Sequence, residues 1–181
     1  MAARVVTPLC RTVIMVGTDL GGMGGVRAVV QGYIDVGLFE RIDCTYVATH
    51  RYGPPWKKVW AALTASAGVA VLLRRRERPL LHVHLAANAS FWRKSVACLL
   101  ARLAGRPYLL HVHSGFFPDF YGRQSGPLAR RMIRGTFAGA AILIALSEQW
   151  RSWLLEICPT ARIEVLANAV ALPDLRQVQR S

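Results

Sequence analysis

The chain has 181 residues, of which 53% are hydrophobic and 18% are charged, and this balance excludes an intrinsically disordered protein. Its length predicts one domain with a sizeable buried core. A formal net charge of +13 favours an acidic partner, which nucleic acid, anionic lipid or a phosphorylated substrate would each provide.

Apolar segments of strand length alternate with helical patterns along the chain. Because the strand segments are continuously apolar, they are typical of a parallel sheet that helices cover on both faces. We therefore predict an α/β fold, a doubly wound Rossmann-like parallel sheet in a single domain at 1–173, with a polar tail at 174–181. The predicted strands are 12–17, 44–49, 80–84, 108–113, 141–145 and 163–166. The predicted helices are 26–36, 56–76, 90–103, 127–137 and 148–155.

The cysteines and the apolar stretches bear on location. Cys10, Cys44, Cys98 and Cys158 form no C-x-x-C pair and are typical of reduced packing residues in a cytosolic protein. The segment before the first predicted strand lacks the apolar core of a secretion signal. The apolar stretch at 59–73 is shorter than the roughly 18 to 20 residues that span a bilayer. We predict a cytoplasmic protein, either free or peripheral at the inner face of the membrane.

Glycines cluster directly after the first predicted strand, at Gly21, Gly22, Gly24 and Gly25. Glycine lets the backbone adopt positive φ and approach a ligand closely, and the helix that follows presents unpaired N–H groups to an anion. The spacing matches neither G-x-G-x-x-G, because Arg27 replaces the last glycine, nor a Walker A loop. The turn therefore predicts a phosphate-facing site without specifying the ligand.

Polar residues follow the ends of the later strands as well. Ligands of doubly wound folds bind outside the carboxyl ends of the strands, so we place the candidate site at that edge of the sheet. Besides the glycines, the candidate binding residues are His84, Asn88, Ser114, Ser147, Glu148 and Asn168, and His113 is the candidate catalytic residue.

Two H-x-H motifs, His82–His84 and His111–His113, lie in the third and fourth predicted strands. Residues two apart point to the same face of a strand, but only His84 and His113 reach the strand ends. We predict that His82 and His111 are core residues hydrogen-bonded to the backbone, whereas His113 opens a polar, aromatic-rich loop. The pairs also suggest zinc, but carboxylates are scarce, and we predict no metal.

Basic residues group with aromatic residues, which resembles the edge of a protein that rests on an anionic bilayer. The helix at 56–76 and the loop at 116–121 carry this prediction. Nucleic acid is disfavoured because the chain has no RNP-like strand, zinc-finger spacing or basic recognition helix. A nicotinamide cofactor is disfavoured because His50 follows the second strand where a ribose-binding acid is expected. The basic residues are Lys57, Lys58, Arg74, Arg75, Arg76, Arg78, Arg93, Lys94, Arg123, Arg130, Arg131 and Arg134, and the aromatic residues are Trp56, Trp60, Phe91, Trp92, Phe116, Phe117, Phe120 and Tyr121.

Five segments, in their order along the chain, resemble the N-terminal domain of the retaining, nucleotide-sugar-dependent glycosyltransferases of family four. The segments are TVIMVGTDLGGMGGVRAVV, HVHLAANASFWRK, HVHSGFF, ALSEQW and VLANAV. Enzymes of that family have two Rossmann-like domains (the GT-B type). The resemblance covers nearly the whole chain and implies that the fold is the N-terminal half of a GT-B fold.

The resemblance also implies roles for particular residues. The turn from Gly21 to Gly25 would lie near the donor diphosphate and the acceptor, and His113 would line the reaction centre. Ser147 and Glu148 resemble the family's serine-containing turn after the fifth strand. The family's N-G-V-D hinge appears here as N-A-V-A from Asn168, which puts the tail at 174–181 at the position of the interdomain hinge.

The function that the resemblance implies is transfer of a sugar from a nucleotide-sugar to a glycan or lipid-linked acceptor. The chain would be the acceptor-side half, without a cofactor beyond the donor substrate, and a C-terminal donor-binding domain would complete it. Because the chain ends where that domain would begin, we expect a truncated or split enzyme with little activity alone, partnered by a separate C-terminal polypeptide. Two alternatives remain: a non-catalytic membrane- or protein-binding module with this fold, and a metal-dependent hydrolase that uses the H-x-H pairs.

Overall fold

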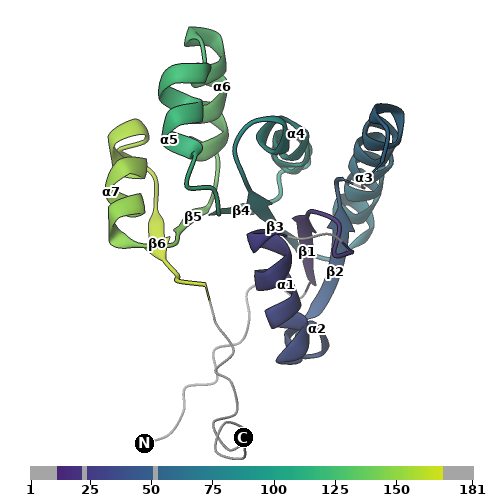
Figure 1. Ribbon diagram of the computed structural model, residues 1–181. Coiled ribbons are helices and arrows are strands. Elements are labelled where there is room, and N and C mark those ends of the chain that lie inside the picture. The colour runs from purple at the N-terminus through teal and green to yellow at the C-terminus, as the bar shows by residue number, and fades with distance from the viewer. Residues whose placement is uncertain (1–11, 22–23, 51–52, 169–181) are drawn as a thin grey trace, which may run out of the picture.

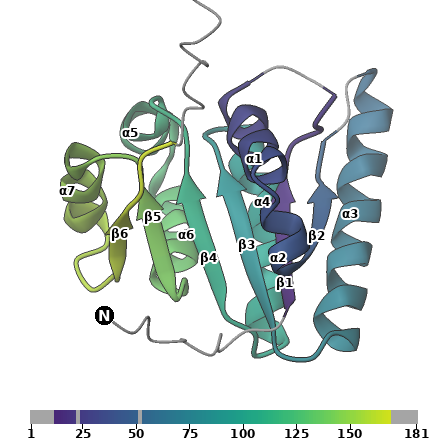
Figure 2. The same ribbon diagram turned by 90° about the horizontal axis from the view of Figure 1, so that it is seen from below.

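The computed structural model describes residues 12–21, 24–50 and 53–168. Its centre is a six-stranded sheet whose strand pairs are all parallel, in the order β2-β1-β3-β4-β5-β6 (Figure 2). The predicted doubly wound, Rossmann-like α/β fold is therefore confirmed. The strands are β1 (Thr12–Gly17), β2 (Asp43–Ala48), β3 (Pro79–Leu85), β4 (Tyr108–Val112), β5 (Ile142–Ala145) and β6 (Ile163–Val165).

Helices cover both faces of the sheet (Figure 1). On one face lie α1 (Gly25–Asp35) and the short α2 (Leu38–Arg41), which the sequence pattern did not predict. On the other face lie α3 (Pro55–Arg75), α4 (Ala89–Leu103) and α6 (Pro127–Ala138). The last helix, α7 (Glu148–Ile157), packs beside β5 and β6 at one end of the sheet.

The two faces of the sheet are buried in different cores. Ile14 of β1 belongs to the larger core, where it is joined by Phe91 of α4. Met15, the next residue of β1, points the opposite way and packs on Val26 and Val30 of α1. This alternation explains why the strands are continuously apolar: a residue on either side of the sheet meets a helix.

A helical segment follows β4 where the sequence predicts an aromatic, membrane-facing loop. It consists of α5 (Phe117–Asp119) and one π-helical turn, η1 (Phe120–Gln124). Phe117 and Phe120 are buried in the larger core, whereas Phe116 is exposed. The prediction for this loop is therefore wrong for most of its aromatic surface, because these rings fill the space between α4, α6 and α7.

The chain changes direction in the sheet at β1. From β1 it continues to β2 on one side, and it then crosses to β3 on the other side of β1. A crossing of this kind opens a crevice outside the carboxyl ends of the two strands that diverge, here β1 and β3. This crevice is the place in the fold where a ligand is expected.

Candidate functional site

The glycine turn follows β1 at this crevice. Gly24 has φ 140° and ψ 161°, and no atom lies within 4 Å of the place where its Cβ would be. Backbone geometry and not packing therefore requires glycine at this position. Gly25 is the first residue of α1, whose N-terminus has no side-chain cap and leaves N–H groups for a ligand. Gly21 is exposed and its N–H donates to Asp19 Oδ1 at 3.1 Å, while Gly22 lies outside the described residues.

Side chains from β2 and α1 hold the turn in place. The Tyr46 hydroxyl donates to the Thr18 carbonyl at 2.5 Å and occupies the space that a Cβ on Gly17 would need. Arg27 Nε donates to the Leu20 carbonyl at 2.7 Å. Arg27, which replaces the last glycine of the dinucleotide-binding pattern, thus stabilises the turn through a hydrogen bond from α1.

Four histidines line the face of the sheet that α1 covers. His84 pairs with His111 across β3 and β4, and His82 and His113 lie two residues away on the same face. The ring centroid of His84 is 6.1 Å from that of Tyr33 on α1, which identifies the face.

Two of these histidines form a hydrogen-bonded pair at the edge of the sheet. His84 Nδ1 and His113 Nε2 are 2.8 Å apart. His84 is the last residue but one of β3, and His113 is the first residue after β4, so the pair borders the crevice. The structure therefore brings the candidate catalytic residue, His113, into direct contact with a second predicted site residue.

Burial keeps the four rings neutral at physiological pH. It lowers the pKa of His82 to about 4 and that of His111 to about 2, and it places the pKa of His84 well below the usual value. The pKa of His113 falls to about 4, first through burial and then through the charge of Lys94. A neutral imidazole has one N–H and one lone pair, so His113 can donate or accept a hydrogen bond but does not act as a cation.

The predicted backbone hydrogen bonds of the inner histidines are not found. His111 is buried, as predicted, but neither of its ring nitrogens has a hydrogen-bond partner, and Nε2 of the half-buried His82 also lacks one. The physical reason is that the neighbouring backbone groups already bond to one another in the parallel ladder. The rings instead stack on each other, with the His82 and His84 centroids 4.5 Å apart.

Three of the rings have the arrangement of a metal site. His82, His84 and His111 offer nitrogen atoms that all lie within 4.8 Å of one another. Neutral imidazoles are ligands for zinc and other transition metals, which would supply a Lewis acid or an activated water. Among the described residues this group has no carboxylate or thiolate. The nearby charge of Lys94, which helps to lower the pKa of His84, would also oppose a dication.

Lys94 is a functional candidate that the sequence reasoning missed. The sequence predicts that Lys94 lies with Arg93 on a basic, aromatic edge that rests on an anionic bilayer, and this prediction is wrong for Lys94, whose side chain is 0% exposed. Its Nζ has no hydrogen-bond partner. Burial lowers the pKa of Lys94 to about 7, and the charge of Arg93 adds to this effect. Since the charge of Lys94 also acts on His84 and His113, it belongs to the same edge of the sheet.

Asn88 and Ser114 follow the strands that carry the histidine pair: Asn88 comes after β3, and Ser114 comes after β4. Asn88 is exposed at the N-terminus of α4 and has φ 59° and ψ −136°, a positive-φ conformation that side chains rarely adopt. Its side chain makes no capping hydrogen bond. Ser114 directly follows His113, and its carbonyl accepts the Phe117 N–H at 3.1 Å. Both residues therefore lie at the same carboxyl edge of the sheet as the pair.

The other predicted residues lie further along the same edge. Ser147 Oγ accepts the Trp150 N–H at 3.3 Å and so caps the N-terminus of α7. Glu148 is exposed and pairs with Arg151 at 3.3 Å, and Asn168 is exposed beyond β6. β5 pairs with β4, the strand that His113 follows, and β6 pairs with β5. The hydrogen bonds found for Ser147 and Glu148 lie within their own helix and do not join them to the histidine pair. The hinge after Asn168 and the tail at 174–181 lie outside the described residues.

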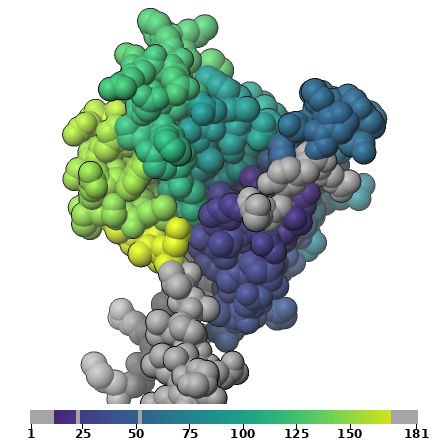
Figure 3. All heavy atoms as spheres, viewed as in Figure 1, coloured from purple at the N-terminus to yellow at the C-terminus, as the bar shows by residue number. Residues whose placement is uncertain are grey.

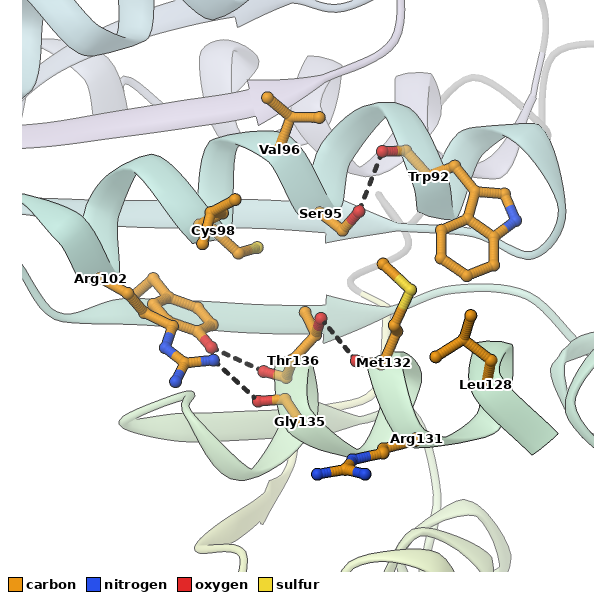
Figure 4. A pocket seen from close by; sticks show the side chains of 12 residues that line it. Trp92, Ser95, Val96, Cys98, Arg102, Leu128, Arg131, Met132, Gly135 and Thr136 are labelled. Carbon is orange, nitrogen blue, oxygen red and sulfur yellow. Dashed lines mark hydrogen bonds between the residues drawn. The ribbon is translucent and has the colours of Figure 1, made fainter.

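A pocket of about 540 Å³ lies elsewhere, between α4 and α6 (Figure 4). Its lining is mainly apolar and includes Trp92, Leu128 and Met132, and Arg102 Nη1 donates to the Gly135 carbonyl at 3.3 Å across it. It contains no histidine or carboxylate, so nothing in its lining suggests acid–base chemistry. The crevice at the carboxyl ends of β1 and β3 therefore remains the candidate site.

The outer side of α3 carries the exposed apolar surface that the sequence predicts. Trp56 and Trp60 are each 63% exposed, and Val59 and Leu63 are exposed between and after them. Their spacing puts these four side chains on one stripe of the helix. The helix lies at one edge of the molecule, beside β2 (Figure 3). In the described ranges, the chain forms no helix with the length and apolar character needed to cross a bilayer.

Comparison with known proteins gives two findings. Residues 24–169 match the family model of the glycosyl transferase 4-like domain. The fold is similar to that in the crystal structure of Anabaena Alr3699/HepE in complex with UDP, with a TM-score of 0.51 and 15% sequence identity. The alignment covers 93% of this chain and 50% of HepE, so the chain spans half the length of that protein. No curated protein sequence matches the chain. Since the family model covers most of the chain, the protein belongs to the glycosyl transferase 4-like family.

Proposed function

We propose that this chain is the acceptor-facing N-terminal domain of a glycosyltransferase that moves a sugar from a nucleotide-sugar to a glycan or lipid-linked acceptor. A C-terminal domain that binds most of the donor, on the same or a separate polypeptide, would complete the enzyme. No further cofactor is proposed. The observation that carries the proposal is the hydrogen-bonded pair of His84 and His113 at the carboxyl edge of β3 and β4, beside the strand β1 that leads into the glycine turn at Gly24.

The proposed roles follow from the chemistry of retaining transfer. Cleavage of the donor leaves a diphosphate whose negative charge must be stabilised, and fixed N–H groups do this best where water is excluded. The N–H groups at the start of α1, which begins at Gly25, would serve the diphosphate. His113 is neutral and held by His84, so it would hydrogen-bond a hydroxyl of the transferred sugar. The complex of HepE with UDP supports a nucleotide as part of the ligand.

A nucleotide-binding experiment tests this function without needing a second domain. Saturation-transfer NMR with UDP-glucose detects weak ligands, and we expect signals from its uridine and glucose protons with the wild-type chain. The His113→Ala variant should lose most of the glucose signal, because it removes the group proposed to bind a hydroxyl of the transferred sugar. The matched control is His82→Ala, a histidine on the same face but away from the edge, which should retain the signal. Absence of UDP binding to the wild type would contradict the proposal.

We further propose that the domain rests on a membrane through α3. The exposed stripe of Trp56, Val59, Trp60 and Leu63 is flanked by Lys57 and Lys58, a combination that suits an anionic lipid surface. This would place a cytoplasmic enzyme beside a lipid-linked acceptor. Cosedimentation with anionic vesicles should exceed that with neutral vesicles. The double variant that combines Trp56→Ala and Trp60→Ala should abolish the difference. Binding that does not depend on lipid charge would refute it.

Two other functions remain as alternatives. A metal-dependent hydrolase is favoured by the grouping of His82, His84 and His111, but this group lacks a carboxylate, so we place it second. A non-catalytic binding module is favoured by the α3 stripe alone. The module would be supported if lipid binding persists in the His113→Ala variant and if neither this variant nor the wild type binds a nucleotide.

A further inference from the structure

Lys94 occupies a position that the fold otherwise gives to apolar residues. The stripe of α4 that faces the sheet consists of Phe91, Ala97, Cys98 and Ala101, all of them buried, and Lys94 stands in its middle. Long side chains on a helix point toward its N-terminus, which for α4 is the carboxyl edge of the sheet. The ammonium group is therefore directed from the core toward the crevice.

The ammonium group has no partner inside the protein. Nζ is buried and makes no hydrogen bond, and the ion pairs found in the described part of the chain involve other basic residues. Burying an unpaired charge is strongly unfavourable, so a position of this kind is tolerated when a ligand supplies the opposite charge.

Other buried donors of the same β3–α4–β4 unit are also without partners. Ser90 lies three residues before Arg93 and four before Lys94, so its Oγ can share a side of α4 with either of them, and Arg93, whose Nε also lacks a partner, directly precedes Lys94. His84 Nε2 and His113 Nδ1, from the adjoining strands, also lack partners, and one of the two carries the second N–H of the neutral pair and can donate. The first turn of α4 contains no acidic residue and no side-chain cap; the Phe91 and Trp92 N–H groups donate to the Asn88 carbonyl, which leaves those of Ala89 and Ser90 available. Such a set of donors matches an anion with several oxygen atoms.

We propose that Lys94, with Ser90, Arg93 and the N-terminus of α4, binds a phosphate group of the substrate. The proposal rests on the proposed function and specifies one of its contacts, because both the donor diphosphate and the phosphate of a lipid-linked acceptor have this chemistry. A phosphate accepts hydrogen bonds through several oxygens at once, whereas a carboxylate has two, so the number of free donors favours phosphate.

The first experiment measures thermal stabilisation by inorganic pyrophosphate at constant ionic strength. Pyrophosphate should raise the melting temperature of the wild type. Its apparent affinity for Lys94→Met should be at least about tenfold weaker, since a charge-assisted contact is lost. Lys57→Met is the matched control, because Lys57 is an exposed lysine on α3. Equal stabilisation of all three proteins would overturn the proposal.

A second measurement does not depend on any variant. Lys57 and Lys58 are the only other lysines in the sequence, so a protein labelled at lysine Cε gives few NMR signals to assign. Pyrophosphate should move the Lys94 signal toward that of a protonated amine at about pH 8, because a bound anion favours the charged form. A Lys94 signal that does not respond would overturn the proposal.

Two ligands separate the possible sources of the phosphate and the two proposals. Weaker binding of UDP to Lys94→Met than to the wild type assigns the site to the donor, and the same result with geranyl diphosphate assigns it to a lipid-linked acceptor. UDP-glucose binding that requires His113 but not Lys94, with no response to pyrophosphate, would overturn the Lys94 site and leave the proposed function standing. Pyrophosphate binding through Lys94 with no UDP binding would support the anion site and contradict the proposed donor contact.

Discussion

Replacing Lys94 by methionine should stabilise the ligand-free protein. Burial lowers the pKa of Lys94 from 10.5 to about 7, and roughly 1.4 kcal/mol for each pKa unit makes the charged amine about 4–5 kcal/mol unfavourable. Methionine has a similar shape without the charge. We therefore expect the free energy of unfolding of Lys94→Met to exceed that of the wild type by about 2–4 kcal/mol near pH 7.

The pH dependence gives a sharper test of the same reasoning. Because the folded-state pKa lies below the unfolded value of 10.5, the unfolded chain binds more protons above about pH 7, and wild-type stability rises with pH there. Below that pH both states are charged and the full penalty remains. Lys94 interacts electrostatically with Arg93 and with three histidines, which are His50, His84 and His113. The pKa of each histidine is lowered, so these rings are neutral above about pH 7 and do not change protonation there.

The assay is urea denaturation of the wild type, Lys94→Met and Lys57→Met at about pH 7 and about pH 8.5. The advantage of Lys94→Met over the wild type should shrink by about 1.5 kcal/mol between the two values, while Lys57→Met tracks the wild type. A Lys94→Met variant that is less stable than the wild type, with a parallel pH dependence, would refute the reasoning. It would mean that the ammonium group is solvated or paired.

Three further predictions follow from the site. Gly24→Ala should lower stability by about 1–3 kcal/mol through backbone strain, while Gly25→Ala, which has open space and no positive φ, should be nearly neutral; equal unfolding midpoints in urea would contradict this. Ser147→Ala should cost about 1 kcal/mol in the same assay through the loss of the α7 cap, and an unchanged midpoint would show that the cap contributes nothing. Protein purified with excess zinc should carry far less than one equivalent by elemental analysis, because Lys94 opposes a dication; one equivalent that disappears in His84→Ala would instead support the metal site.

The sequence predicts the sheet well because its strands are short, apolar and separated by helical patterns. The positions of His84 and His113 at the carboxyl edge also follow from periodicity, since residues two apart share a face and only the second of each pair reaches the end. Their hydrogen bond does not follow, because it depends on β3 lying next to β4, and a strand order cannot be read from a single sequence. The burial of Phe117 and Phe120 was missed for a similar reason, since the turn after β4 has no regular period.

Lys94 shows how composition and position can point to opposite conclusions. Beside Arg93 it looks like part of a solvated basic cluster, and the high net charge of the chain encourages that interpretation. Its spacing from Phe91 and Cys98, three and four residues, instead puts it on the buried stripe of α4. A hydrophobic stripe that contains a lysine close to the carboxyl edge of a parallel sheet is a local conflict, and such conflicts tend to occur at functional sites. Here the conflict lies beside the pair of His84 and His113, so the same edge of the sheet combines neutral hydrogen-bonding groups with a cation that lacks a counter-charge.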